Sequence, residues 1–133
     1  MRGERGLREV LMNVALLVGQ ALLAVVFAYS GALKVSQPKE KLLKMGQTGV
    51  AVFPGPLLRL VALCELLGVV GVIVPWLTNR APGLTPAAAA GFVVVMVGAI
   101  AAHVRLHEPR NVAATSFILL VAAAVAVGRF AGM

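Results

Sequence analysis

The sequence predicts an all-α membrane protein, an antiparallel bundle of four transmembrane helices with a short interfacial helix between the first two. Of its 133 residues, 60% are hydrophobic and 13% are charged, whereas about a quarter of the residues in a soluble domain are charged. Four apolar stretches are each close to the ~20 residues that a helix needs to cross a bilayer. Helices are expected because every backbone amide in the bilayer core needs an internal hydrogen-bond partner.

The four apolar stretches form a single membrane domain of residues 1–133, and they cover residues about 10–33, 57–76, 87–104 and 112–130. The first stretch is longer than the ~7–15 apolar residues of a signal peptide, so we expect it to be retained as a span. Pro56 and Pro86 are each predicted to be the first residue of a helix, where proline is favoured. Thr85 and Asn111 are candidate caps of the third and fourth helices.

The connections between the stretches differ in length. Residues 77–85 and 105–111 form short connections, which makes the helices that they join antiparallel neighbours. The connection at residues 34–55 is longer, and its segment 38–45 (PKEKLLKM) has the pattern of a short amphipathic helix. We expect this segment to lie along the membrane interface with its lysines toward the lipid headgroups.

The net charge of +7 comes from basic residues that bracket the apolar stretches. This placement is typical of anchors to anionic headgroups, so we expect the lipid bilayer, and no nucleic acid, as a partner. The basic residues are divided too evenly between the two ends of the predicted bundle for the positive-inside rule to orient it. The expected localisation is a bacterial cytoplasmic membrane, as a multi-pass protein. The single cysteine, Cys64, excludes an intrachain disulfide.

Glu65 is the one acidic residue inside an apolar stretch. A carboxylate at that depth is costly, needs a partner, and marks either a functional site or a structural ion pair. The predicted topology brings the ends of all four helices together on one side, and His103 at that end is the expected hydrogen-bonding partner. Lys34 or Arg105 would add compensating charge. Arg59 is a poorer candidate, because a separation of six residues places it about 120° around the same helix.

The candidate ligand-binding cluster consists of polar residues that the topology gathers near Glu65: Glu65, His103, Lys34, Arg59, Arg105, Tyr29 and Gln20. Gln20 is expected either to hydrogen-bond another helix or to line a cavity that extends from the cluster. The cations could instead be interfacial anchors. No catalytic residue is predicted, because the sequence has no phosphate loop and no CxxC motif. No metal site is predicted, because His103 and His107 supply only two secure ligands.

Several short motifs occur in order along the four stretches: Gly31-x-x-Lys34, Arg59 with Glu65-Leu66-Leu67-Gly68, Pro75, Gly98-Ala99 and His103-x-Arg105. In these motifs, over residues about 27–130, the chain resembles the DoxX-like family of small four-helix membrane proteins. The resemblance implies the four-helix fold. It also implies redox or oxidative-stress partners, since the family is named after a membrane subunit linked to thiosulfate:quinone oxidoreductase. Distant animal relatives act as assembly chaperones for membrane receptors.

The expected function is that of a non-catalytic membrane subunit, which binds a quinone- or lipid-like molecule around Glu65 beside a redox partner. The apolar part of the site would hold the tail of that molecule. One alternative is an assembly or interaction factor for membrane proteins, in which small-residue helix faces dock a partner and Glu65 is structural. A second alternative is a small proton-coupled transporter, for which four helices would need a homo-oligomer.

Overall fold

The computed structural model describes residues 2–131, and all regular secondary structure in that range is helical. The elements are α1 (Arg2–Ser36), α2 (Lys39–Lys44), the 3-10 helix η1 (Thr48–Val52), α3 (Gly55–Thr78), α4 (Leu84–Arg105) and α5 (Pro109–Phe130). The predicted all-α class is confirmed. The four long helices are each long and apolar enough to cross a membrane, and they contain the four predicted stretches.

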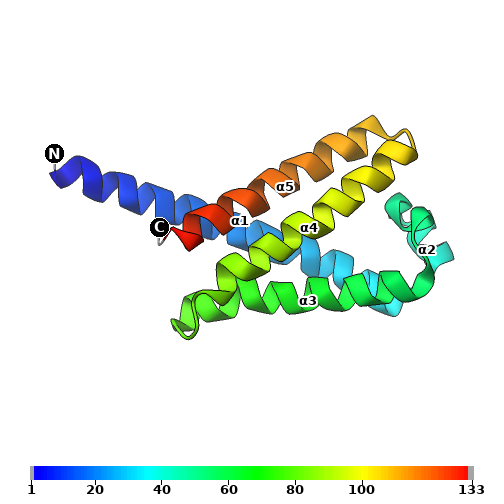
Figure 1. Cartoon of the computed structure of the whole chain (residues 1–133), viewed down its shortest axis with the longest axis horizontal. Helices are drawn as coiled ribbons and strands as arrows, with labels where there is room; N and C mark the ends of the chain where they lie inside the picture. The colour runs from blue at the N-terminus through cyan, green and yellow to red at the C-terminus, as the bar shows by residue number, and fades with distance from the viewer. Residues whose placement is uncertain (1, 132–133) are drawn as a thin grey trace.

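Helix α1 is longer than its predicted membrane span. It has 35 residues and begins at Arg2, whereas the predicted span begins near residue 10. At 1.5 Å per residue the helix is about 52 Å long, and a hydrocarbon core is about 30 Å thick. The N-terminal part of α1 projects beyond the other long helices (Figure 1). Only part of α1 therefore belongs to the bundle.

Helices α3 and α4 begin differently with respect to their prolines. Pro56 is the second residue of α3, one position later in the helix than predicted. The prediction for α4 was wrong by two residues, because this helix begins at Leu84 and Pro86 lies inside it. The Thr85 hydroxyl makes no cap but donates to the carbonyl of Gly71 on α3 at 3.1 Å. Thr85 therefore forms a hydrogen bond between two helices in place of the expected cap at the start of its own helix.

The four long helices form two layers. Helix α1 packs against α3, and α4 packs against α5, while contacts of α3 with α4 and of α1 with α5 join the layers. Neighbouring helices run in opposite directions, and the layers diverge toward the end that holds α2 (Figure 1). We call this end, with Lys34 and Glu108, the open end of the bundle. The other end, with Arg129, is the closed end.

Small residues let the layers approach each other away from the open end. A Cβ atom at Gly68 of α3 would lie 2.5 Å from Cε1 of Phe92 on α4. The ring of Phe92 stacks on the ring of Phe27, with centroids 3.9 Å apart. A Cβ atom at Gly128 of α5 would lie 2.7 Å from Leu16 on α1. Close packing of this kind stabilises helix pairs in lipid, where the hydrophobic effect gives little drive.

A buried polar cluster around Arg129 ties three helices together at the closed end. Arg129 Nε donates to Gln20 Oε1 at 2.7 Å, and its Nη1 donates to Asn13 Oδ1 at 2.8 Å. The guanidinium lies 3.9 Å from the centre of the Trp76 ring. Gln20 Nε2 in turn donates to the carbonyl of Val72 at 2.8 Å. Charged and polar groups inside a membrane bundle need such partners.

The segment between α1 and α3 covers the open end. Helix α2 falls within the predicted helix 38–45, and Gly46 follows it with a φ of 90°, a conformation that glycine adopts without strain. Leu42, Val50 and Leu58 form a small apolar core beneath this segment. The placement of α2 along a membrane interface stays a prediction.

Candidate functional site

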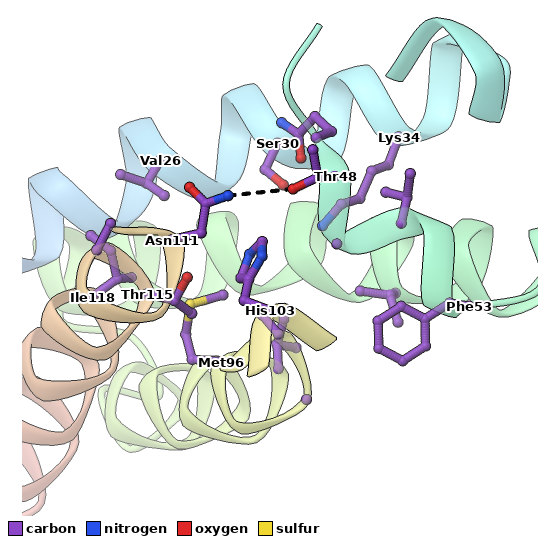
Figure 2. A pocket seen from close by; sticks show the side chains of 18 of the residues that line it. Val26, Ser30, Lys34, Thr48, Phe53, Met96, His103, Asn111, Thr115 and Ile118 are labelled. Atoms are coloured by element: carbon purple, nitrogen blue, oxygen red, sulfur yellow. Dashed lines mark hydrogen bonds between the residues drawn. The ribbon is translucent and has the colours of Figure 1, made fainter. Parts of the chain in front are cut away.

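A cavity of about 650 Å³ lies between the two layers at the open end (Figure 2). Its walls come from α1, α4, α5, the start of α3 and the segment 46–53 that contains η1. Polar side chains line the part near the helix ends: Ser30, Lys34, Thr48, His103 and Asn111. Aliphatic and thioether side chains line most of the deeper part, together with the hydroxyl of Thr115: Val26, Val61, Val95, Met96 and Ile118. The cavity is therefore polar at its mouth and mainly apolar toward the bundle centre.

Glu65 on α3 does not line the cavity but pairs with Lys34, which does. The Glu65 side chain is 0% exposed, and Lys34 Nζ donates to its Oε1 at 2.8 Å. The predicted partner, His103, was wrong. The physical reason is that α1 and α3 pack in the same layer, whereas His103 belongs to α4 in the other layer, across the cavity. The second carboxylate oxygen, Oε2, has no hydrogen-bond partner among the described residues.

The other predicted site residues are dispersed. The Arg59 guanidinium donates to the backbone carbonyl of Lys34 and is exposed, and Arg105 is exposed at the end of α4. Tyr29 lines the edge of the cavity and is mostly exposed. Gln20 belongs to the Arg129 cluster at the closed end, so its predicted hydrogen bond to another helix is confirmed. Neither Gln20, Arg59 nor Arg105 is among the described residues that line the cavity.

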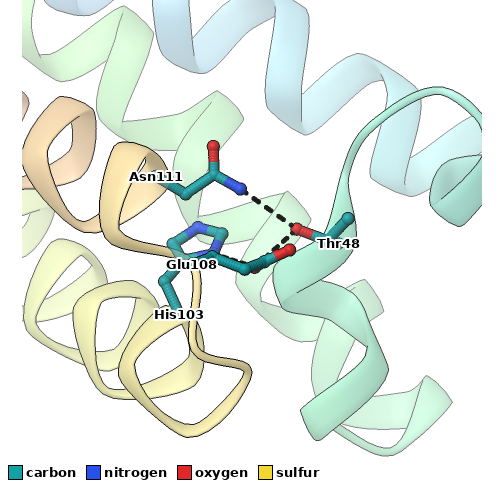
Figure 3. A network of polar contacts seen from close by, with 4 residues as sticks. All are labelled: Thr48, His103, Glu108 and Asn111. Atoms are coloured by element: carbon teal, nitrogen blue, oxygen red, sulfur yellow. Dashed lines mark hydrogen bonds and ion pairs between the residues drawn. The ribbon is translucent and has the colours of Figure 1, made fainter.

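A second polar network joins η1 to the corner between α4 and α5 (Figure 3). His103 Nδ1 and Thr48 Oγ1 both lie 2.9 Å from Glu108 Oε1, and the Thr48 hydroxyl donates to this oxygen. Asn111 Nδ2 donates to Thr48 Oγ1 at 3.4 Å. Asn111 is therefore not the cap of α5, because Glu108 occupies the N-cap position ahead of Pro109. We call these four residues, Thr48, His103, Glu108 and Asn111, the corner network.

The corner network keeps the Glu108 carboxylate ionised. The hydrogen bond from His103, and then the one from Thr48, lowers the pKa of Glu108 below its ordinary value of 4.5. An ionised carboxylate accepts both bonds and holds the His103 ring in one orientation. The segment that carries η1 is thereby fastened over the mouth of the cavity.

Comparison with known protein families identifies the chain. A model of the DoxX-like family matches residues 7–125, which is most of the 133 residues. The chain belongs to the DoxX-like family. Neither curated proteins nor solved structures gave a match. The family assignment and the four long apolar helices make it an integral membrane protein.

In this DoxX-like protein, some of the motif residues that carried the resemblance lie at the cavity. Lys34 and His103 line its mouth, and Ala99 lines the wall between them and the deeper part. Glu65 supports Lys34 from behind. Gly68, one turn further along α3, accommodates the ring of Phe92. Motif residues from α1, α3 and α4 thus meet at the mouth of the cavity, whereas Gly68 and Pro75 lie elsewhere on α3.

Sequence reasoning missed two members of the corner network. Glu108 carried a signal, because an acidic residue directly before Pro109 is favoured at the start of a helix, where the helix dipole attracts negative charge. Thr48 carried no signal in the sequence, since nothing in the connection at residues 34–55 indicates which residue would reach α5. His107 lies beyond the end of α4, and no three His, Cys, Asp or Glu side chains gather within the described part of the chain.

Proposed function

We propose that this DoxX-like protein is a non-catalytic membrane subunit that holds a quinone- or lipid-like molecule in the cavity at the open end. The observation that carries the proposal is the distribution of polarity in this cavity. Ser30, Lys34 and Asn111 offer hydrogen-bond donors at the mouth, and Val95 and Met96 provide apolar surface below. An amphiphilic molecule would match this pattern with its head at the mouth and its tail toward the bundle centre.

The size and charge of the site favour one kind of ligand. A volume of 650 Å³ lies within the range of about 300–1,000 Å³ found for small-molecule sites. Lys34 and His103 at the mouth each have a carboxylate partner, Glu65 and Glu108. Lys34 is the one lysine or arginine among the described residues that line the cavity, and Glu65 already accepts a hydrogen bond from it. This favours an uncharged head with carbonyl or hydroxyl oxygens, such as a quinone ring, over a phosphate.

The proposal of a redox partner is based on membership of the DoxX-like family. The family is named after a membrane subunit linked to thiosulfate:quinone oxidoreductase, and this chain has no redox-cofactor motif of its own. The protein would hold the amphiphile, and the partner would carry out the electron transfer. This division of roles places no chemical step on the residues around the cavity.

The test compares two variants that differ only in where a bulky side chain is placed. Ala99 lines the cavity, whereas Val97 on the same helix does not and faces outward. We expect quinone or neutral lipid to co-purify with the wild-type protein and with Val97→Trp, and to be lost from Ala99→Trp, as measured by mass spectrometry of the extracted protein. Equal ligand content in Ala99→Trp and Val97→Trp, with both folded by circular dichroism, would reject the proposal.

A further inference from the structure

We infer that the cavity opens sideways into the lipid between α1 and α5, and that the tail of the bound amphiphile passes through this opening. The opening is defined by Val25 and Tyr29 on α1 and Ala114 on α5, and we call it the side opening. The inference rests on the proposed function and adds the route by which the ligand enters and the requirement that it carry a flexible chain.

The first observation is that the close contacts between α1 and α5 lie toward the closed end and the middle of the bundle. A Cβ atom at Gly19 of α1 would lie 3.0 Å from Val125 of α5, and Arg129 of α5 hydrogen-bonds Gln20 of α1. From there the two helices diverge (Figure 1). At the open end, Val26 and Ser30 of α1 face the α5 side chains across the cavity (Figure 2). On this side of the cavity, the wall is formed by α1 and α5, and these two helices separate toward the open end.

The second observation is that residues on both edges of this gap line the cavity and are also exposed. Val25 is 69% exposed and Tyr29 is 61% exposed, although both line the cavity. Ala114 on α5 is likewise exposed and lines it. A side chain that contacts the cavity and the surroundings at once lies at an edge of an opening. The edges on α1 and α5 belong to the same gap.

The third observation is the depth of the gap. Val25 precedes Lys34 by nine residues, or about 14 Å along the helix axis. If Lys34 lies near the headgroup region, as its place near the end of α1 indicates, Val25 lies well inside the hydrocarbon core. An opening with Val25 and Ala114 at its edges is apolar and faces acyl chains. It would admit a hydrocarbon or isoprenoid chain at little desolvation cost.

The opposite side of the bundle, between α3 and α4, is better covered. One exposed residue lines the cavity there, Val94 on α4. However, η1 packs against α4, and Phe53 packs with the buried Leu58 at the start of α3. The segment 46–53 therefore closes much of the α3–α4 side. Its contact with α5, between Thr48 and Asn111, lies at the mouth, nearer the start of α5 than Ala114. The side opening is the less obstructed route.

The experiment uses photolabelling from within a bilayer. The probes are a ubiquinone analogue and a monoacylglycerol, each with a diazirine in its chain next to the head, in vesicles of phosphatidylethanolamine and phosphatidylglycerol. When the head occupies the mouth, the diazirine lies near Val95 and Met96 on the inner wall, which are less exposed than Val25, Tyr29 and Val94 at the edges of the cavity. Mass spectrometry of the labelled protein identifies the modified residues.

The decisive variants are Val25→Trp and Ala114→Trp, which obstruct the side opening from its two edges. Their matched controls are Val18→Trp and Ala113→Trp, exposed residues of the same types on the same helices that do not line the cavity. We expect inner-wall labelling to be lost in both obstructed variants and kept in both controls. Two edges are used so that misfolding of one variant does not decide the result.

Each other outcome contradicts a definite part of the account. Labelling of the wild-type inner wall that persists in Val25→Trp and Ala114→Trp overturns the side opening and leaves the proposed function standing. Labelling lost in Val94→Trp but kept in those two variants moves the route to the α3–α4 side and also overturns it. Absence of inner-wall labelling in the wild type with both probes overturns the proposed function together with the inference.

Discussion

At the scale of single residues, Glu65 can occupy the apolar interior because Lys34 reaches it from the neighbouring helix. The two side chains meet at 2.8 Å, and one carboxylate oxygen remains without a partner among the described residues. A buried ion pair is not in itself a strong source of stability, since desolvation of both charges offsets their attraction. Removal of one partner alone, however, leaves a charge in a medium that solvates it poorly.

The cost of leaving one buried charge unpaired predicts how the stability of variants of this pair will change. We expect Lys34→Met or Glu65→Leu alone to lower the free energy of unfolding by about 3–5 kcal/mol. The double variant should lose less than the sum of the two, because neither charge is then left alone. Detergent-induced unfolding followed by circular dichroism measures these values. Lys39→Met, which removes a lysine bonded to the backbone carbonyl of Phe53, is the control. Additive losses would show that the two residues are not coupled.

Glu108 gives a prediction for acidic pH. Because hydrogen bonds from His103 and Thr48 lower the pKa of Glu108 in the folded protein, the carboxylate stabilises the fold above its ordinary pKa of 4.5. That contribution is lost as the pH falls through the lower pKa of the folded state. The melting temperature of the wild type should therefore fall more between about pH 6 and pH 3.5 than that of Glu108→Gln.

The control for this prediction is Glu40→Gln, which changes an exposed glutamate on α2. It should retain the wild-type dependence of the melting temperature on pH. If Glu108→Gln shows the same acid dependence as the wild type, the corner network does not fasten η1 through an ionised carboxylate.

At the scale of helices, the packing of α3 on α4 depends on the missing side chain at Gly68. A Cβ atom there would lie 2.5 Å and 2.7 Å from two atoms of the Phe92 ring. That ring cannot retreat easily, because it stacks on Phe27. We expect Gly68→Ala to destabilise the protein by about 1–3 kcal/mol through overpacking.

The matched control is Gly91→Ala on α4, where a Cβ atom meets nothing within 4 Å. This substitution should be neutral or slightly stabilising, because alanine favours a helix over glycine by up to about 1 kcal/mol. Thermal unfolding of both variants compares the two sites directly. Similar losses at Gly68 and Gly91 would indicate that the contact with Phe92 is not the cause.

The sequence predicted the helices well and their contacts poorly, for a physical reason. Apolar length and proline position are local properties, and they located all four long helices and α2. Thr85 and Asn111 were assigned to caps because their side chains can serve a local helix end. In the fold they bond to Gly71 and Thr48 on other elements. Which of these bonds forms depends on which helices are adjacent, and hydrophobic patterns do not contain that information.

At the scale of the whole molecule, the bundle is a wedge that is fastened at the closed end and hollow at the open end. Arg129 is the centre of the closed end, with bonds to Gln20 and Asn13 and a ring contact with Trp76. We expect Arg129→Met to lower the free energy of unfolding by about 1–3 kcal/mol for each buried polar group left unpaired. Arg80→Met, at an exposed arginine in the α3–α4 connection, should change it little.

Composition predicted the membrane class and the four-helix bundle, but it did not predict the wedge. The divergence of the layers follows from close contacts at Gly68, Gly19 and Gly128 together with the Arg129 cluster. Many glycines and alanines occur along all four helices, and the sequence does not distinguish those at helix contacts from those facing lipid. For the same reason Glu65 was recognised as buried while its partner was misassigned: the pairing of α1 with α3 decides between Lys34 and His103.

The most direct test of the account is an experimental structure of the wild-type protein in lipid nanodiscs prepared with native membrane lipids. We predict chain-like density in the cavity between the α1–α3 and α4–α5 layers, with its polar end within hydrogen-bond distance of Lys34, Ser30 or Asn111. The density should continue between Val25 and Ala114 toward the surrounding lipid. A bundle whose layers close upon each other at the open end, with no space left between Lys34 and His103, would contradict the account.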